Sequence, residues 1–226
     1  MAAQLLPFPQ HPRLWRGRGQ QPEQPAWPSG YEALDQLLPG GGWPQGALSE
    51  ILLPKPGYGE LNLLLPALAK ASQNNRSIAF IAPPLVLNGP TLSACGLQLE
   101  QVLLVDSDND NDTRWAAEQC MRAQLFAFVL VWPGRCDDRH LRRLQLAAEQ
   151  GQCAGVLLRP SQYARSPSPA QLRLCLDCKS QSPAKQITLA LIKARGLACS
   201  IAQPRKLQID LDTYGSSAAE VAVAGY

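Results

Sequence analysis

The sequence contains no long hydrophobic run: none approaches the ~18 apolar residues that a helix needs to cross a bilayer. The first residues also lack the order of a secretory signal. Prolines interrupt their short apolar part, and the basic residues follow that part instead of preceding it. We therefore expect a cytoplasmic protein without membrane contact, which joins the nucleoid only when it is bound to partners there.

Strong charge of either sign is missing as well. The formal net charge is +3 at pH 7, which falls short of the basic footprint of a dedicated DNA-binding domain. Only two histidines are present, His11 and His140. No recognisable motif places a nucleophile or a carboxylate around His140, so we expect a surface helix residue rather than a catalytic base.

The cysteines and acidic residues do not form metal motifs. Seven cysteines are scattered across expected helices and strands, which favours reduced thiols over a disulfide framework. Cys175 and Cys178 have the spacing of half a zinc site, but no second half follows. The run DSDNDND at 106–112 lacks the glycine and the final glutamate of a calcium loop in either register. We expect no metal and no cofactor, and Asp112 as the cap of the next helix.

Length and composition favour one medium-sized domain with tails. A chain of 226 residues can bury ~70% of its unfolded surface. We expect a loosely ordered N-terminal arm at 1–28, rich in Pro, Gln and Arg, because that stretch lacks periodicity. A folded domain is expected at 29–212 and a tail of small residues at 213–226.

The middle of the chain alternates between apolar runs and amphipathic segments. Ser29 is expected to cap the first helix and Pro66 to interrupt the second. Continuous apolar strands separated by helices indicate a parallel sheet covered on both faces. The expected strands are 47–53, 77–83, 101–105, 125–132 and 153–159, and the expected helices are 29–38, 60–72, 89–96 (a short helix or turn), 113–123 and 137–151.

After about residue 160 the pattern changes to alternation in twos. The segments 171–178, 186–194 and 206–212 each alternate apolar and polar residues, with turn residues between them. Such segments are typical of antiparallel strands added to a sheet edge. The predicted fold class is therefore α/β, with a mostly parallel sheet flanked by helices and antiparallel strands at the C-terminal end.

The segment LLPKPGYGEL, 52–61, places glycines between an expected strand and an expected helix. A working phosphate loop has a first Gly, a flexible middle and Gly-Lys-Ser/Thr at the helix start. Aligned on Gly59, this chain has Pro54 at the first Gly, Glu60 at the Lys and Leu61 at the Ser/Thr. Prolines lack N–H donors, so the amide groups around Gly57 are also depleted.

Glu60 is the decisive departure from a phosphate loop. A carboxylate would face the phosphates where an ammonium should, and each such interaction at ~4 Å is on the order of several kcal/mol. As the first residue of a helix, however, glutamate complements the helix dipole. We expect a helix start without a ligand. The alternative is a deviant phosphate loop in which Lys55 supplies the charge, but such loops keep the second lysine too.

The other positions that an ATPase would use agree with this interpretation. The strand at 125–132 ends in Trp132, where a magnesium-binding Asp would be expected. The strand at 77–83 runs into Pro83 and Pro84, where a water-activating Glu would be expected. The sequence therefore predicts a protein that is not an ATPase and that has no catalytic residues.

With these motifs in view, the chain resembles ImuA, a RecA-like family of translesion-synthesis accessory proteins. The resemblance covers nearly the whole chain and implies a RecA-like core. It rests on LWRG (14–17), GYEALD (30–35), LPGGGWPQGALSEIL (38–52), GEL (59–61), LLLPALA (63–69), GVLLRP (155–160) and LQIDLD (207–212).

From about Leu48 to Pro160 the chain is also similar to SulA, the SOS-induced inhibitor of cell division, which resembles the same core without a nucleotide site. The ImuA resemblance implies a non-catalytic adaptor of SOS-induced translesion synthesis. Its partners would be ImuB and a DnaE-type error-prone polymerase, with RecA as a further partner and DNA contacted only indirectly. The SulA resemblance implies the alternative, an inhibitor of cell division that binds FtsZ.

Two groups of basic residues are candidates for binding partners. Trp15 stands between Arg16 and Arg18 and other basic residues in the arm, and Trp and Arg anchor many interfaces. Partner docking, a solvated tail and single-stranded DNA contact remain open for it. Arg142 and Arg143 lie on the amphipathic helix expected at 137–151. A solvated helix face and contact with an acidic partner or DNA remain open there.

Overall fold

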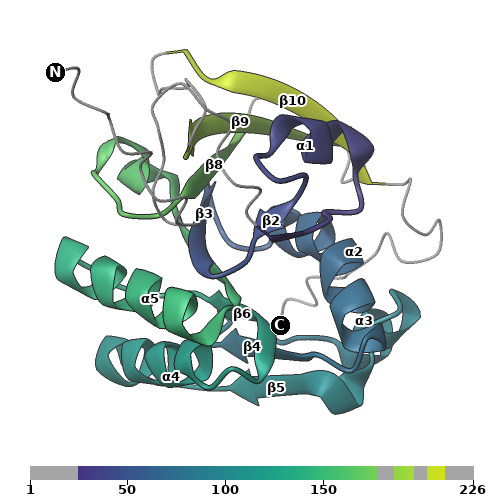
Figure 1. The fold of residues 1–226 in the computed structure, drawn as a ribbon, viewed down its shortest axis with the longest axis vertical. Helices are drawn as coiled ribbons and strands as arrows, with labels where there is room; N and C mark the ends of the chain where they lie inside the picture. The colour runs from purple at the N-terminus through teal and green to yellow at the C-terminus, as the bar shows by residue number, and fades with distance from the viewer. Residues whose placement is uncertain (1–24, 178–185, 196–202, 212–226) are drawn as a thin grey trace, which may run out of the picture.

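One large sheet organises the protein. The computed structural model describes residues 25–177, 186–195 and 203–211. Within these residues an eight-stranded sheet has the order β10-β9-β8-β3-β7-β6-β4-β5 (Figure 1). Its strands are β3 (Ala47–Leu53), β4 (Ser77–Ile81), β5 (Val102–Val105), β6 (Phe126–Val131), β7 (Ala154–Pro160), β8 (Leu172–Asp177), β9 (Gln186–Ala194) and β10 (Arg205–Asp210).

The strands from β8 to β5 are parallel. Strand β3 lies between β7 and β8 and pairs in parallel with both. This register sets Glu50 opposite Leu157 on one side and Arg173 on the other, and sets Leu52 opposite Arg159. Every side chain of β3 is buried, as expected for a strand that is covered on both faces.

Strands β8, β9 and β10 pair antiparallel with one another. They extend the sheet beyond β3, so the segments that alternate in twos do lie at one end of the sheet. The predicted fold class, α/β with a mostly parallel sheet flanked by helices and antiparallel strands at the C-terminal end, is confirmed. The expected tail at 213–226 and Cys178 lie outside the described residues.

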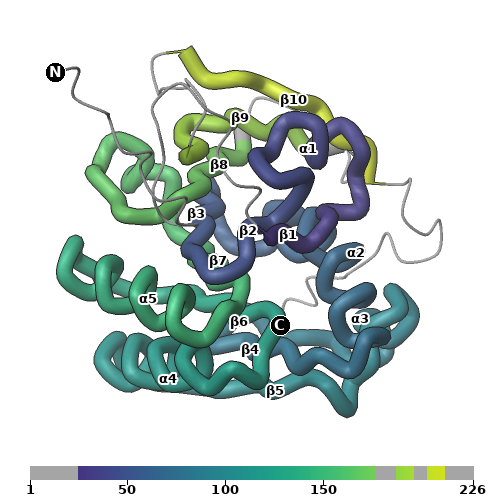
Figure 2. Tube along the Cα trace, in the orientation of Figure 1, coloured from purple at the N-terminus to yellow at the C-terminus, as the bar shows by residue number. Residues whose placement is uncertain are grey.

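The helices form a layer on each face of the sheet. One hydrophobic core joins the sheet to α1, α2 and α3, and the second core joins it to α4 and α5. Figure 2 shows α4 and α5 running side by side; α4 contacts β4 and β6, and α5 contacts β3 and β7. The helices are α1 (Glu32–Leu37), α2 (Glu60–Gln73), α3 (Gly89–Ala94), α4 (Asp110–Arg122) and α5 (Asp138–Gly151), and short 3-10 turns occur at η1 (Leu99–Gln101) and η2 (Ser161–Arg165).

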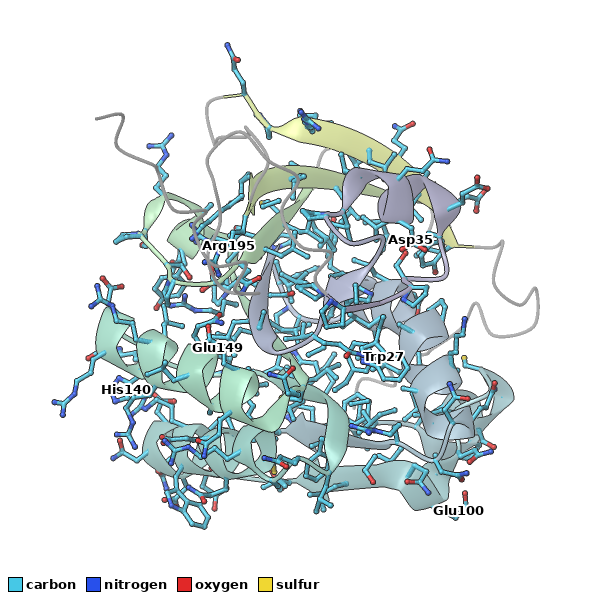
Figure 3. All side chains as sticks on the ribbon, viewed as in Figure 1. Trp27, Asp35, Glu100, His140, Glu149 and Arg195 are labelled. Carbon is cyan, nitrogen blue, oxygen red and sulfur yellow. The ribbon has the colours of Figure 1, made fainter. Side chains whose placement is uncertain are left out.

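A small two-stranded sheet precedes β3. Strands β1 (Ala26–Trp27) and β2 (Trp43–Pro44) pair antiparallel. We had assigned β1 to the N-terminal arm. The ring of Trp27 lies 5.9 Å from that of Phe128 on β6, in the middle of the molecule (Figure 3). Strand β1 is thereby fixed to the main core.

The expected cap of the first helix was wrong. Tyr31, not Ser29, is the N-cap of α1. The Ser29 hydroxyl accepts a hydrogen bond from the Tyr31 amide at 3.1 Å, and the Ser29 amide donates to Asp35 at 2.8 Å. Serine thus shapes the turn before the helix through a local side-chain bond instead of capping it.

We expected Pro66 to interrupt α2, and this expectation was wrong. The helix runs continuously from Glu60 to Gln73. A helical proline leaves the carbonyl four residues earlier without a donor, and here that carbonyl belongs to Asn62. The Tyr31 hydroxyl donates to it at 3.0 Å, so the lost helical bond is replaced by a tertiary one. Within the described ranges, no helix is long and apolar enough to span a membrane.

Candidate functional site

The glycine loop lies where the sequence predicted it, between β3 and α2. Glu60 begins α2 and its side chain is only 3% exposed. Its Oε1 accepts a hydrogen bond from the Gly57 amide at 2.8 Å. The carboxylate therefore folds back into its own loop and takes up an amide that a phosphate loop would offer to its ligand.

Side chains from the C-terminal strands cover the same loop. Gly59 has φ +88°, and a Cβ at this position would lie 2.9 Å from Cδ1 of Ile187 on β9 and 3.7 Å from Cδ1 of Leu211. Lys55 is exposed, with its Nζ 5.8 Å from the centre of the Tyr58 ring. The contacts from Ile187 and Leu211 come from over a hundred residues away, and no local pattern predicts them.

The neighbouring strand ends are occupied by apolar residues. Trp132 follows β6 directly and packs against the core that includes α2. Pro83 and Pro84 follow β4, where Ala82 donates its amide to the Val105 carbonyl at 2.8 Å. All these positions lie where the sequence placed them. The absence of ATPase activity stays a prediction.

A buried cluster of charges, which the sequence reading missed, lies across β3, β7 and β8. Glu50 is fully buried and accepts from two arginines: Arg159 Nη1 at 2.9 Å and Arg173 Nε at 2.6 Å. The Ser168 hydroxyl donates to the same carboxylate at 2.9 Å. The Lys193 ammonium donates to the Ser168 carbonyl at 2.7 Å, and burial together with nearby Arg173 lowers the pKa of Lys193.

The cluster fastens η2 and the segment after it onto the sheet. Arg173 donates to the carbonyls of Tyr163 and Ser166 at 2.9 and 3.0 Å. The Arg159 guanidinium lies 4.2 Å from the centre of the Tyr163 ring, and its Nη2 donates to the Cys136 carbonyl at 3.1 Å. We interpret the cluster as structural, because the buried Glu50 carboxylate pairs with both Arg159 and Arg173.

Of the basic candidates on α5, one has a structural partner. Arg143 pairs with buried Glu118 of α4 at 2.7 Å, and Arg122 of α4 pairs with the same carboxylate at 2.7 Å. Arg142 is exposed. Glu118 thereby joins the two helices. The candidates of the arm, Trp15, Arg16 and Arg18, lie outside the described residues.

The acidic run at 106–112 forms a loop and a helix start. The cap of α4 is Asn109, whose side chain accepts from the amides of Asn111 and Asp112 at 3.0 and 2.9 Å. Our assignment of the cap to Asp112 was wrong, because the helix begins at Asp110, three residues before the expected start at Thr113. In the described part of the chain, no group of three His, Cys, Asp or Glu side chains could hold a metal ion.

The two outermost strands of the sheet differ in character. β10 carries Arg205 and Lys206, both exposed, and charge is a common protection of sheet edges. β5 has the sequence VLLV, with Leu103 42% and Leu104 53% exposed. The start of β5, next to Glu100, lies across the molecule from Arg195 at the end of β9 (Figure 3). Among the described residues, strand β5 is thus an edge with exposed apolar side chains and no charge of its own.

Fold and loop together define an α/β protein whose phosphate-loop position is filled by its own side chains. A family model described as "Cell division inhibitor SulA" matches residues 46–155, which run from just before β3 into β7. The chain is 30% identical over 122 residues to the cell division inhibitor SulA of Cronobacter sakazakii, covering 52% of this chain and 71% of that protein. The chain belongs to the SulA family.

Two further relatives are also named as the cell division inhibitor SulA. The SulA of Photorhabdus laumondii is 26% identical over 111 residues, which are 49% of this chain and 63% of that protein. The SulA of Serratia proteamaculans is 27% identical over 115 residues, 51% of this chain and 68% of that protein. This chain therefore spans about two thirds of the length of these relatives, and about half of it has no counterpart in the alignments.

These relatives correct our main functional expectation. A translesion-synthesis adaptor of the ImuA type is contradicted, because the relatives are named as inhibitors of cell division. Nothing in them supports ImuB or a DnaE-type polymerase as partners. Much of the ImuA resemblance lies outside 46–155, and part of it reflects the fold: a Cβ at Gly42 would lie 2.1 Å from the Trp27 carbonyl oxygen. Such a glycine is required by close backbone approach, whatever the function.

Proposed function

We propose that this chain inhibits bacterial cell division by binding FtsZ, as the SulA resemblance implies, and that it does so without enzymatic activity. The observation that carries the proposal is membership of the SulA family, over the segment that builds most of the parallel sheet. The same relationship supports expression within the SOS response. Fold alone would not assign a function, so the proposal rests on the relatives and on the closed loop.

The closed loop supports a binding role over a catalytic one. Glu60 takes the Gly57 amide, and Ile187 and Leu211 lie against Gly59. A nucleotide would have to displace these apolar contacts and then meet a carboxylate instead of a lysine. We propose that ATP has no role in the inhibition.

Strand β5 is the surface that we propose for FtsZ. It lies within the family-matched segment, and the exposed Leu103 and Leu104 give it an apolar character that the charged β10 edge lacks. Exposed apolar groups on a sheet edge are unfavourable unless a partner covers them. Leu99, 40% exposed in η1 just before β5, extends the same surface.

The test is sedimentation of FtsZ polymers formed with GTP, at increasing concentrations of this chain. We expect the pelleted fraction to fall, with no requirement for ATP. Leu104→Lys should weaken the inhibition by ~10-fold or more, the loss expected when an apolar interface anchor is replaced by a charge. The matched control is Leu146→Lys, which changes a leucine of similar exposure, 59%, on α5; this helix contacts β3 and β7, which β6 and β4 separate from β5.

Two results would each overturn one part of the proposal. If FtsZ pelleted fully at every concentration of the folded chain, the function would be wrong. If the wild-type chain inhibited FtsZ and both lysine variants inhibited it equally well, the function would stand and the assignment to β5 would fail.

A further inference from the structure

Basic side chains gather around η2 and the end of β9, outside the segment that matches the SulA family. Arg165 in η2 and Arg195, directly after β9, are both exposed, and Lys193 on β9 is half-buried (Figure 3 labels Arg195). Within the described ranges, neither exposed arginine has an ion-pair partner. Both are therefore available to a ligand from outside the chain.

Hydrogen bonds and strand register bring these residues to one end of the sheet. Arg173 donates to the carbonyls of the residues just before and just after Arg165, at 3.4 and 3.0 Å. The pairing of β8 with β9 sets Lys193 opposite Arg173. The Arg195 amide donates to the Gln171 carbonyl at 2.9 Å, in the stretch that joins η2 to β8. The buried Arg173 and its strand pair thus hold the basic residues together.

Positive charge exceeds negative charge at this place. Among the described carboxylates, the one that acts on Lys193 is that of Glu50, which Arg159 and Arg173 already share. Burial, and then repulsion from Arg173 and Arg195, lowers the pKa of Lys193, although Glu50 opposes this. An anion bound over these groups would relieve the repulsion between them.

An aromatic ring lies beside the same cations. Tyr163 of η2 is half-buried, and the Arg159 guanidinium lies 4.2 Å from the centre of its ring. The Tyr163 carbonyl accepts from Arg173 at 2.9 Å, so the residue is fixed on the buried cluster. Proteins hold single-stranded nucleic acid by stacking bases on aromatic rings while cations follow the phosphates. The ring and the exposed arginines supply both kinds of contact.

We propose that this part of the surface binds single-stranded nucleic acid. The surface, called the η2 surface below, consists of Tyr163, Arg165, Lys193 and Arg195. Phosphates lie against the cations, and a base stacks on the part of the Tyr163 ring that Arg159 leaves free. Contacts to phosphate carry no sequence information, so we expect binding without sequence preference. The inference does not depend on FtsZ.

Other occupants fit the η2 surface less well. A lipid surface takes up apolar side chains together with charge, and an interface with a protein has an apolar centre. Among the described residues, no large hydrophobic side chain from 159 to 211 is exposed. Duplex DNA offers no unstacked base to Tyr163, and a formal net charge of +3 is small for a protein that binds duplexes.

The experiment is fluorescence anisotropy of a labelled single-stranded oligonucleotide of mixed sequence, titrated with the full chain without FtsZ. We expect saturable binding with a dissociation constant of ~1–100 µM at low salt, the range of binding through phosphates. With about three phosphate contacts, the slope of log affinity against log salt should be about −2. A duplex of the same sequence should bind more weakly.

Charge reversal tests the two exposed arginines. Arg165→Glu and Arg195→Glu should each weaken binding by ~10-fold or more and make the salt slope shallower by ~1. Because both positions are exposed, the variants should keep the fold, which urea unfolding checks. The control is Arg76→Glu, the same change at an exposed arginine just before β4, which β7 and β6 separate from β3. It should leave binding within ~2-fold of wild type.

Tyr163→Leu separates stacking from charge. It should weaken oligonucleotide binding by ~5-fold or more, leave the salt slope unchanged, and leave binding of inorganic polyphosphate unchanged. A folded chain that shows no saturable binding would overturn the proposal, and so would binding that the two arginine variants leave intact. Polyphosphate or anionic vesicles that bind as tightly as the oligonucleotide, with no effect of Tyr163→Leu on the oligonucleotide, would overturn the assignment to nucleic acid.

Discussion

The hydroxyl of Tyr31 donates a hydrogen bond to the carbonyl of Asn62 at 3.0 Å. Asn62 is the residue whose carbonyl Pro66 leaves without a helical donor, four positions along α2. The segment before α1 thus completes the helix that follows the glycine loop. Tyr31 is 6% exposed, so no solvent could easily take its place.

This relationship predicts a coupling between Tyr31 and Pro66. Tyr31→Phe should destabilise the protein by about 1 kcal/mol, the usual net loss for one hydrogen bond. In a Pro66→Ala background the alanine amide can donate to Asn62, so the same change should cost less. Urea unfolding of the four proteins forms the double-mutant cycle. Equal costs in both backgrounds would show that Tyr31 acts through packing alone.

The buried Glu50 cluster predicts a large effect from a small change. Glu50→Gln keeps the side-chain shape but leaves Arg159 and Arg173 without a carboxylate, and breaking a buried pair costs about 3–5 kcal/mol. Urea unfolding measures this loss. The control is Glu149→Gln, the same substitution at an exposed position on α5 (Figure 3), which should change stability by less than ~0.5 kcal/mol. A Glu50→Gln protein as stable as its control would contradict the structural role of the cluster.

Because Ile187 packs against Gly59, alanine should destabilise the protein more at Gly59 than at Gly41. Gly41→Ala places a side chain at φ +72° in open space and should cost ~1–2 kcal/mol from backbone strain. Gly59→Ala adds contact with Ile187 to similar strain at φ +88°, and it should cost clearly more. Ile187→Val removes the atom in the way and should recover the difference. Thermal unfolding of the set checks this. Equal costs at both glycines would mean that β9 does not fill the loop.

Two buried thiols predict a loss of stability in alkaline solution. Burial raises the pKa of Cys136 to about 11 and that of Cys153 to about 12, from an ordinary value of 9.0. Above pH 9 the unfolded chain therefore releases these protons while the folded chain keeps them. Stability should fall as pH rises from 9 towards 11, by up to ~1.4 kcal/mol per pH unit for each thiol.

Unfolding in urea at pH 8 and pH 10 measures this fall, and the Cys136→Ala, Cys153→Ala double variant serves as the control. The fall should be smaller in the variant. Alkylation of the native protein at pH 8 should be slow at both cysteines, since the thiolate is the reactive form. A wild-type protein with the same pH dependence as the variant would contradict the raised pKa values.

The sequence predicted the sheet well because its evidence is local. Apolar runs such as 126–131 have the length and continuity of strands buried on both faces, and the helices between them have a clear polar side. The chemistry of the loop was also readable, since Glu60 occupies a position whose role depends on one residue type.

Contacts between residues far apart in the chain could not be predicted from the sequence. Glu50 appears in the sequence as one carboxylate in an apolar strand, and its partners Arg159 and Arg173 follow more than a hundred residues later. Pro66 looks like a helix interruption because Tyr31, which compensates for it, lies 31 residues from Asn62. The functional expectation failed for a related reason: segments such as 38–45 reflect turn geometry that several functions share.

Equilibrium binding of the purified chain to FtsZ, measured with and without ATP, tests the central claim most directly. A saturable complex that ATP neither strengthens nor weakens, and that Leu104→Lys disrupts while Leu146→Lys does not, is the result we predict. A folded chain that shows no binding to FtsZ, or a complex that forms only with ATP, would contradict the account.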